Sequence, residues 1–570
     1  MNQIFKLPIE YDKYKKTISQ KLNNDLELIT VNENNETSDS IYNIVFQPQT
    51  SFGTKMLENW SKYYTTNKSF LKDSKKIYNK LKCSVDQEKI NVFYNAWNDM
   101  IQDSTFKQKF QYINWKRFNF LNNYELFLQG MSMYNLTSPF FSLLFPLVIL
   151  IVPFFILKIM GKPITFEFYK QILFSQLKNH TLFRLFTNYS HVDNGQKMYF
   201  IVTFVLYIFN IYQNILTCIK FYGNFNLIHN FFKNSTIFFT YIKQQMDHFL
   251  STTKNYESYN SFKTELIKYK TNIETYILQL KNSQPYKIRH IFKIGKKMKL
   301  FYQFKYNQEF IDTCSYSLGF VGYMDNILGL QKNIKERNMT YGKIGKTTKF
   351  KNILHPTLSN KNPVKNNIKL DKNYVISGPN ASGKTTLLKT VIINTILTQQ
   401  LYCGFYDKAT IKPIDVFHCY LNIPDTNGRD SLFQAEARRC KEILNEINND
   451  ENNNENNDGK THFCIFDELY SGTNPVEAVG SAYSYLKYIS TNPNVKFMLT
   501  THFIKLCNLI EDDENISNIS NLKMKACIQN NDVKYFYVIE DGISNVKSGF
   551  QVLKTLNYPQ KILEDVFSFN

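Results

Sequence analysis

The octapeptide GPNASGKT, residues 378–385, constrains the fold of this 570-residue chain more than any other feature. An apolar run, YVIS, precedes the octapeptide, and the helix-forming run TTLLKTVIINTIL starts at its last residue. The spacing of glycine, four residues and Gly-Lys-Thr is that of a phosphate-binding loop between a strand and a helix. We therefore expect an α/β phosphate-loop domain in the C-terminal part of the chain.

Each residue type in this loop has a chemical role. Gly378 and Gly383 let the backbone turn so that successive N–H groups face the phosphate oxygens. Lys384 neutralises the β- and γ-phosphate oxygens, and the Thr385 hydroxyl is a ligand for Mg²⁺. The sequence thus predicts an ATPase with ATP and Mg²⁺ as its ligands.

Two later apolar runs end in polar residues that suit Mg²⁺ binding and ATP hydrolysis. The run FCIF delivers Asp467 and Glu468 at its carboxyl end, and the run VKFML leads to Thr501 and His502. We expect Asp467 to hold Mg²⁺ through water and Glu468 to polarise the attacking water. His502 can reach the γ-phosphate or that water, and the alternative is a structural histidine at a strand end. The predicted catalytic residues are Glu468 and His502, and the predicted metal ligands are Thr385 and Asp467.

The middle of the chain loses its charge. No residue between Glu125 and Lys158 is charged, and residues 139–157 are apolar apart from Ser142. A helix of that length spans about 28 Å, close to the hydrocarbon thickness of a bilayer. A second uncharged stretch, residues 198–219, is interrupted by asparagine and glutamine. The two stretches predict a transmembrane hairpin within residues 136–222, with two buried core helices as the alternative.

The remaining segments differ in composition. Residues 1–40 are an N-terminal extension without the apolar region of a signal peptide, and residues 41–135 mix charged and aromatic residues as amphipathic helices do. Charged amphipathic helices over residues 223–335 suit a lever. Residues 336–570 form the ATPase domain, with a loop-like start up to residue 370. Its asparagine-rich run at 445–460 predicts a disordered insert.

Charge and cysteine content narrow the possible partners only slightly. The net charge of +20 favours a polyanion or an anionic membrane, but lysine-rich and asparagine-rich composition also follows from an AT-rich genome. The nine cysteines include no Cys-x-x-Cys pair, which argues against a zinc site and for a reducing compartment.

Several motifs taken in order resemble one family. GPNASGKT, DSLFQAEARRCKEIL, FDELYSGTNPVEA and TTHF resemble the ATPase domain of the MutS family, an ABC-type ATPase. The run ILHPTL and the C-terminal run DGISNVKSGFQVLKTLNYPQKILEDV are also similar to it. This resemblance covers about residues 350–565. A weaker similarity, in TSFGTKMLENWSKYY near residue 50, is to the start of the family's helical core domain.

The resemblance implies a dimer, of identical subunits or of homologues, with composite ATP sites. The segment 425–433 would approach the ATP of the partner subunit, with Ser431 as the contact. It also implies slow, switch-like hydrolysis and a role related to DNA mismatch repair, with DNA held by the lysine-rich lever without sequence choice. The predicted nucleotide-binding residues are Gly378, Pro379, Asn380, Ala381, Ser382, Gly383, Lys384, Thr385, Thr386 and Ser431.

The chain also departs from the family. Mismatch-repair members have some hundreds of residues before the helical core, including a module that wedges a phenylalanine into DNA beside a glutamate two positions later. Here about 40 residues precede the core-like start, and Phe-x-Glu occurs once, at residues 466–468. We therefore expect the mismatch-reading module to be absent.

Three functions follow from these patterns. The first is a dimeric ATP-driven switch or clamp of the MutS family, anchored in a membrane and binding DNA. The second is a soluble DNA-repair ATPase in the nucleus or cytoplasm, with the apolar stretches buried. The third is a membrane-associated ATPase scaffold without a DNA role. For the first we expect a multi-pass membrane protein whose ATPase domain faces the cytosol or the nucleus.

Overall fold

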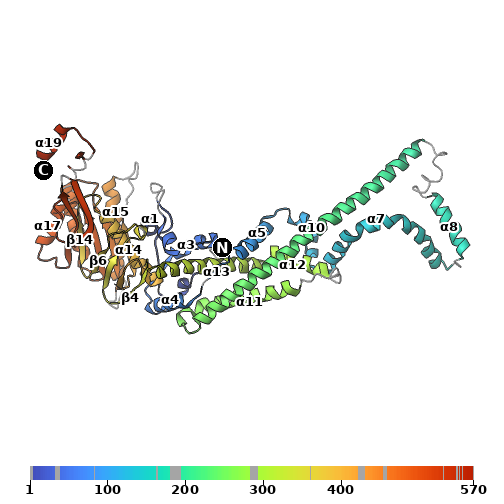
Figure 1. Cartoon of the computed structure of the whole chain (residues 1–570), viewed down its shortest axis with the longest axis horizontal. Coiled ribbons are helices and arrows are strands. Elements are labelled where there is room, and N and C mark those ends of the chain that lie inside the picture. Colours follow the sequence, from blue (N-terminus) through green and yellow to red (C-terminus); the bar gives the residue numbers. More distant parts are fainter. Residues whose placement is uncertain are drawn as a thin grey trace. The chain divides into compact units, whose positions relative to one another are not determined.

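The computed structural model describes the chain apart from short segments. These segments are residues 1–3, 32–38, 83, 162–164, 180–193, 283–292, 360, 422–430, 453–458, 530–531, 547–549, 551–552, 555 and 569–570. The chain divides into two compact units (Figure 1). The first unit comprises Met1–Val85, Gln245–Tyr269 and Ser315–Asn570, and the second comprises Asp86–Gln244 and Lys270–Cys314.

A six-stranded sheet is the centre of the C-terminal part of the first unit, in the order β10-β11-β12-β7-β13-β14. Neighbouring strands from β10 to β13 are parallel, and β14 pairs antiparallel with β13. Parallel strands with both faces covered are nearly continuous apolar runs, as β11 and β12 are here. The strands are β7 (Asn373–Ser377), β10 (Val416–Tyr420), β11 (His462–Asp467), β12 (Val495–Thr501), β13 (Ile519–Gln529) and β14 (Asp532–Asp541).

Helices and a smaller sheet complete this domain. The helices are α14 (Lys384–Leu401), α15 (Leu432–Asn452), α16 (Pro475–Ser490), α17 (Ile504–Asp512) and α19 (Gln560–Ser568). A four-stranded sheet, in the order β4-β9-β5-β6, contains β4 (Lys343–Ile344), β5 (Thr348–Ile353), β6 (Asn366–Leu370) and β9 (Lys408–Ile411). A two-stranded ribbon pairs β3 (Thr340–Tyr341) with β8 (Cys403–Gly404). The described part of the chain thus confirms the predicted C-terminal α/β domain.

Two expectations for this domain are wrong in part. Residues 335–370 were expected to be loop-like, but β3 to β6 lie there, and alternate side chains of β5, such as Thr348 and Phe350, are buried. Residues 445–452 of the expected disordered insert are helical, because α15 continues to Asn452. Cys440, Ile443 and Ile447 follow a helical spacing and are buried in the domain core, which extends the helix into the asparagine-rich run. Residues 453–458 lie outside the described part.

The N-terminal segments of the first unit are mostly short helices. They are η1 (Pro8–Tyr11), β1 (Lys15–Thr17), α1 (Gln20–Asp25), α2 (Ile41–Phe46), α3 (Ser51–Trp60), β2 (Tyr63–Thr65) and α4 (Lys68–Lys80). The short helix η4 (Glu257–Tyr259) lies in the Gln245–Tyr269 segment of the same unit. The buried carboxylate of Asp325 accepts hydrogen bonds from the backbone N–H of Gln49 and from both the N–H and the hydroxyl of Thr50. This contact fixes the start of α3 against α13 (Gln308–Lys335).

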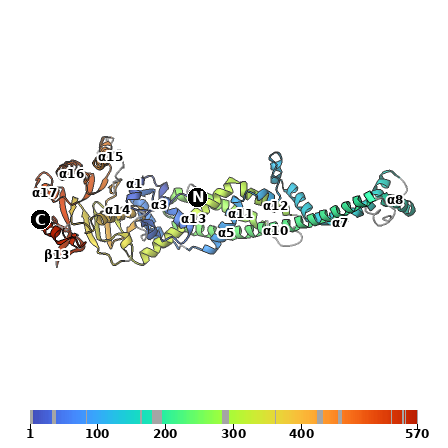
Figure 2. The same ribbon diagram turned by 90° about the horizontal axis from the view of Figure 1, so that it is seen from above.

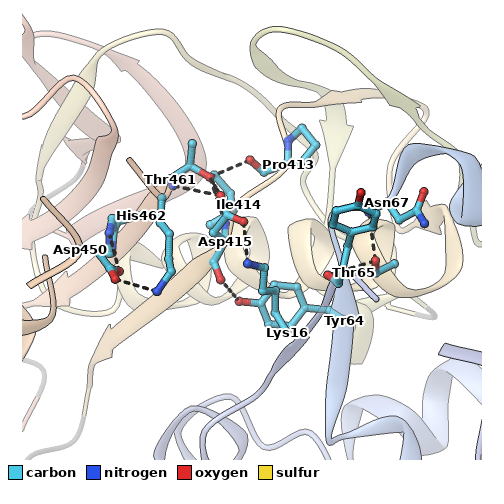
Figure 3. A network of polar contacts seen from close by, with 12 residues as sticks. Lys16, Tyr64, Thr65, Asn67, Pro413, Ile414, Asp415, Asp450, Thr461 and His462 are labelled. Carbon is cyan, nitrogen blue, oxygen red and sulfur yellow. Dashed lines mark hydrogen bonds and ion pairs between the residues drawn. The ribbon is translucent and has the colours of Figure 1, made fainter. Parts of the chain in front are cut away.

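A polar network attaches the N-terminal segment to the base of the six-stranded sheet (Figure 3). Asp415 accepts hydrogen bonds from the N–H and the hydroxyl of Thr461, and its carboxylate lies 3.1 Å from Lys16 Nζ. Its backbone carbonyl accepts a hydrogen bond from the hydroxyl of Tyr64. Beside it, Asp450 lies 2.7 Å from Lys460 Nζ and 3.4 Å from the ring of His462. The network joins residues that are far apart in the sequence and brings Asp450 and Lys460 of the asparagine-rich run together.

The second unit is helical and rich in aromatic contacts. Phe93 stacks on Phe238 with ring centroids 4.1 Å apart, and Phe304 stacks on Phe310 at 4.0 Å. Its own elements are α5 (Gln87–Gln102), α6 (Phe106–Lys109), η2 (Lys116–Asn123), α7 (Glu125–Ile159), α8 (Phe166–Asn179) and α12 (Ile294–Tyr306). Three helices have residues in both units, namely α10 (Asn194–Thr253), α11 (Asn260–Asn282) and α13. The predicted helical character of the region before the α/β domain is confirmed.

Both uncharged stretches lie in long helices, α7 and α10 (Figure 2). Helix α7 continues through its three prolines, and α10 runs across the expected boundary at residue 222. Among the described residues, one helix, Lys197–Thr253, is long and apolar enough to cross a membrane, and none of its most apolar window is buried. Side chains at residues 145–150 of the first stretch lie outside the described part.

Helix α13 carries glycines where other backbone segments approach it closely. A Cβ atom at Gly329 would lie 1.6 Å from the carbonyl oxygen of Phe46, and one at Gly322 would lie 2.5 Å from that of Phe52. Neither carbonyl belongs to a flexible side chain, so neither can turn away. The two glycines therefore set the distance at which α2 and α3 pack on α13.

We expect Gly329→Ala to destabilise the protein by about 3 kcal/mol, because the backbone of α2 has to move. Gly480→Ala is the matched control, since Gly480 lies in α16 with no atom near its missing Cβ. That substitution should stabilise by about 0.5–1 kcal/mol through helix propensity. Urea midpoints compared at constant m-value measure both changes. A neutral or stabilising Gly329→Ala would contradict the close contact between α13 and α2.

Candidate nucleotide-binding site

The glycine-rich loop connects β7 to α14 at the carboxyl ends of the parallel strands. Ala381 and Gly383 have positive φ angles of 61° and 91°, so the chain turns sharply before entering the helix. A Cβ on Gly378 would lie 3.0 Å from Ser382 Oγ and 3.1 Å from the side chain of Met524. The first turn of α14 carries Lys384 and Thr385 and places the positive end of the helix dipole at the loop.

The amino group of Lys384 lies inside this loop. Its Nζ donates hydrogen bonds to the carbonyl oxygens of Gly378, at 2.9 Å, and Pro379, at 3.1 Å. Burial lowers the pKa of Lys384, and the charges of Glu468 and Asp467 oppose that shift. The cation is therefore held with few water contacts, where its attraction for an anion is stronger than in solvent.

Asp467 ends β11 beside the first turn of α14. Its carboxylate accepts a hydrogen bond from the Thr385 hydroxyl at 2.8 Å and another, on its second oxygen, from the hydroxyl of Thr500. The structure thus brings together the two residues that the sequence predicts as metal ligands. Thr500, on the neighbouring strand β12, is an orienting partner that the sequence interpretation did not include.

Glu468 and His502 meet at the ends of β11 and β12. Glu468 Oε1 lies 2.6 Å from His502 Nε2, and this hydrogen bond is the largest cause of the lowered pKa of Glu468. Lys384 Nζ lies 3.2 Å from the same Nε2. The Glu468 backbone, directly after β11, has a positive φ of 54°.

A cavity of about 610 Å³ opens beside these groups. The loop, Glu468 and the first turns of α14 line one part of it. The other part is lined by residues that the sequence interpretation missed, among them Leu354, His355, Met524 and Tyr537. Burial lowers the pKa of His355 to about 4, so this imidazole is neutral at physiological pH. His355 lies in the run ILHPTL, which is similar to the MutS family in sequence but was not assigned to the site. No local sequence signal placed Tyr537 at the cavity.

Asn366 fixes the position of Tyr537. Its side-chain nitrogen donates to the carbonyl of Tyr537 and its side-chain oxygen accepts from the N–H of Ile539, both at 2.9 Å. Tyr537 has a positive φ of 56° and lies in β14, where the pairing with β13 changes register. The bulge thus brings the tyrosine ring to within 3.2 Å of the position that a Cβ on Gly383 would occupy.

Ser431 has a local role in this chain. Its hydroxyl accepts a hydrogen bond from the N–H of Gln434, and its own N–H donates to the Gln434 side chain, which together cap α15. The residue is exposed. The predicted contact of Ser431 with a partner subunit remains a prediction, and residues 425–430 of the same predicted segment lie outside the described part.

The loop has the features that a bound nucleotide with Mg²⁺ requires. Ser382 is buried, and its hydroxyl has no hydrogen-bond partner among the described residues. The loop places this hydroxyl with Lys384, Thr385 and Asp467, which is a set of oxygen ligands and one cation. Oxygen ligands of this kind suit Mg²⁺, and backbone N–H groups with a lysine suit phosphate. The residues present therefore fit both groups.

A parallel sheet with a glycine-rich loop after a central strand defines an α/β domain of the nucleotide-binding class. Residues 374–568 match the family described as MutS domain V, and this domain is the ATPase domain of that family. The resemblance of the chain to the MutS family is confirmed through this domain.

The similar proteins are DNA mismatch repair proteins. The chain is 25% identical over 258 residues to DNA mismatch repair protein MutS of Persephonella marina, covering 43% of this chain and 28% of that protein. It is 26% identical over 230 residues to that of Staphylococcus haemolyticus, covering 38% and 24%. It is 26% identical over 200 residues to DNA mismatch repair protein MSH2 of Saccharomyces cerevisiae, covering 33% and 19%. The matched region thus spans less than a third of each of these relatives.

We expect Gly383→Ala to weaken binding of a fluorescent ATP analogue at least tenfold, because the loop needs its positive φ and Tyr537 lies against it. Gly542→Ala is the matched control, since Gly542 has a φ of 103° and no atom near its missing Cβ. Both variants carry a similar backbone cost of about 1–2 kcal/mol. Equal loss of nucleotide binding in both variants would show that the effect comes from stability and not from the loop.

Proposed function

We propose that this chain is an ATP-hydrolysing conformational switch of the MutS family. One observation carries the proposal. Lys384, Thr385, Asp467, Glu468 and His502 come from the first turn of α14 and from the carboxyl ends of the neighbouring strands β11 and β12, and they meet beside one cavity. These are the groups needed to hold a triphosphate, orient a water and stabilise the charge that develops during phosphoryl transfer.

Each residue has a defined task in this mechanism. The loop N–H groups, Ser382 and Lys384 bind the phosphate oxygens, and Thr385 and Asp467 hold Mg²⁺. When bound, Mg²⁺ neutralises the charge on the phosphate oxygens. Glu468 is ionised because its pKa is lowered, so its carboxylate can accept the proton of the attacking water. His502 orients that carboxylate through the 2.6 Å hydrogen bond.

The Glu468→Gln variant tests this mechanism. We expect ATP hydrolysis to fall about 10²- to 10³-fold while ATP still binds, because the amide cannot accept the proton. Glu477→Gln is the control, since Glu477 is exposed on α16 and bonds only to Thr473 among the contacts described for it. Unchanged hydrolysis in Glu468→Gln would contradict the proposed role of Glu468.

DNA binding forms a further part of the proposal. The relatives are mismatch repair proteins by name, and the chain has a net charge of +20, which suits a polyanion held without sequence choice. The same hydrolysis assay, with duplex and with branched DNA, separates the alternatives. Stimulation by DNA and trapping of DNA by Glu468→Gln support a clamp. A rate that ignores DNA but responds to lipid supports the membrane-associated ATPase scaffold.

Membrane association through α7 and α10 is the third part of the proposal. Exposed apolar side chains cover both helices, for example Phe140, Phe155, Val205 and Phe209. Polar contacts join the two helices at Ser142, whose carbonyl accepts a hydrogen bond from the Tyr207 hydroxyl and whose hydroxyl accepts one from the side chain of Asn214. Apolar side chains outward and polar contacts inward suit a helix pair in a bilayer. Together the helices would make a multi-pass membrane protein whose ATPase domain faces the compartment that contains ATP.

We expect Val205→Arg to reduce the fraction of full-length protein that resists alkaline extraction from membranes. An arginine at the centre of a span costs about 2.5–3.5 kcal/mol on the insertion scale. Leu278→Arg is the control, because Leu278 is equally exposed on the charged amphipathic helix α11. Equal membrane retention of wild type and Val205→Arg would contradict insertion of α10, and complete solubility of wild type would contradict membrane association.

A further inference from the structure

The segment between α6 and α7 has polar residues on its inner side. Asn122 is fully buried, and its side chain makes two 2.9 Å hydrogen bonds with the N–H and the carbonyl of Ile113. Asn119 accepts hydrogen bonds from Lys107 Nζ at 2.9 Å and from the hydroxyl of Tyr302 at 3.0 Å. These contacts fix η2 to the helices of the second unit through its polar side chains.

The outer side of the same segment is aromatic. Trp115 is 75% exposed, Tyr124 is 58% exposed and Leu126 is 87% exposed. Phe118 and Phe120 are exposed as well. The fully buried Asn122 beside exposed aromatic residues reverses the usual arrangement of a protein in water. Because the backbone is held by the asparagines, these five side chains form a fixed apolar surface, here called the aromatic surface, which suits an apolar partner.

Charge and position indicate which partner this is. Lys116 and Arg117 are exposed within the segment, and the exposed Glu125 is the one acidic residue of 115–126. No lysine or arginine follows until Lys158. The aromatic surface leads directly into the exposed apolar side chains of α7. A strand of nucleic acid would meet two cations and then an uncharged helix. A bilayer would meet cations, then aromatic rings, then aliphatic side chains, which is the order of its headgroups, interface and hydrocarbon.

Helix α10 also carries a cation and an exposed aromatic residue near the same place. Its uncharged stretch ends where Lys220 and the exposed Tyr222 follow. The side chain of Cys218 contacts the carbonyl of Leu136, and the side chain of Asn224 bonds to the carbonyl of Lys109. The ends of both uncharged stretches therefore lie together, beside the segment that carries the aromatic surface.

We propose that the aromatic surface binds the headgroup region of an anionic lipid bilayer, with Lys116 and Arg117 against the lipid phosphates. This inference rests on the proposed membrane association of α7 and α10 and places the boundary between lipid and water at residues 115–126. The aromatic rings would lie at the interface, and the cations would add a preference for anionic lipid.

Tryptophan fluorescence of the full-length protein in vesicles tests the inference. The chain has three tryptophans, of which Trp60 is buried, Trp97 is half-buried and Trp115 is exposed. The difference between wild type and Trp115→Phe therefore isolates the signal of Trp115. The vesicles contain phosphatidylcholine with bromine either near the headgroup or near the end of the acyl chain. We expect stronger quenching of Trp115 by the bromine near the headgroup.

Charge reversal tests the preference for anionic lipid. The preference for vesicles with phosphatidylserine over pure phosphatidylcholine should fall at least about thirtyfold in the double variant Lys116→Glu/Arg117→Glu, since each cation contributes about 1 kcal/mol at such a surface. Lys349→Glu/Lys351→Glu is the matched control, with two exposed lysines of β5. An unchanged preference in the first variant would overturn the assignment of Lys116 and Arg117.

The outcomes separate this inference from the proposed function. Protein that resists alkaline extraction while Trp115 is not quenched by brominated lipid keeps the membrane association and overturns the aromatic surface as its anchor. Protein that does not associate with vesicles at all overturns both. Quenching of Trp115 by oligothymidylate, without quenching by brominated lipid, would overturn the inference and assign the surface to nucleic acid.

Discussion

Burial of helix α14 is the constraint on which the rest of the first unit depends. Its first turn carries Lys384 and Thr385 at the loop, and its last turn carries Gln399 and Gln400, both buried. The Gln400 side chain donates to the carbonyl oxygens of Trp60 and Tyr63 and accepts from the Tyr42 hydroxyl. Buried amides of this kind are costly unless every partner is in place. Any displacement of the loop that shifts the helix is therefore transmitted to the N-terminal segments.

The chemistry of the site depends on the same geometry. The carboxyl ends of parallel strands meet at one edge of a sheet. The pairing of β7, β11 and β12 therefore places the loop, Asp467, Glu468 and His502 at the same edge. Hydrogen bonds from neighbouring residues then fix the orientation of the two carboxylates. Thr500 orients Asp467, and His502 orients Glu468.

The sequence was sufficient for those parts that local patterns encode. The loop, the two strands that end in Asp467 and His502, and the helical region before them could be expected, because spacing and apolar runs are local properties. Tyr537 could not, since it reaches the cavity through a bulge that depends on Asn366, far away in the chain. The strands at 340–370 were missed because they are short and charged on one face. Helix α15 was expected to end too early because asparagine content outweighed the buried Ile447.

The contact between Asp450 and Lys460 has a consequence for how this chain can vary. It joins Asp450, inside the asparagine-rich run, to Lys460 at the end of that run, beside the strand that begins at His462. Once two residues are held together, each doubling of the chain length between them costs only about 0.6 kcal/mol. A change in the number of residues between Asp450 and Lys460 should therefore have little effect on the sheet. For the same reason this stretch of chain is a suitable place to graft an epitope or a fluorescent reporter.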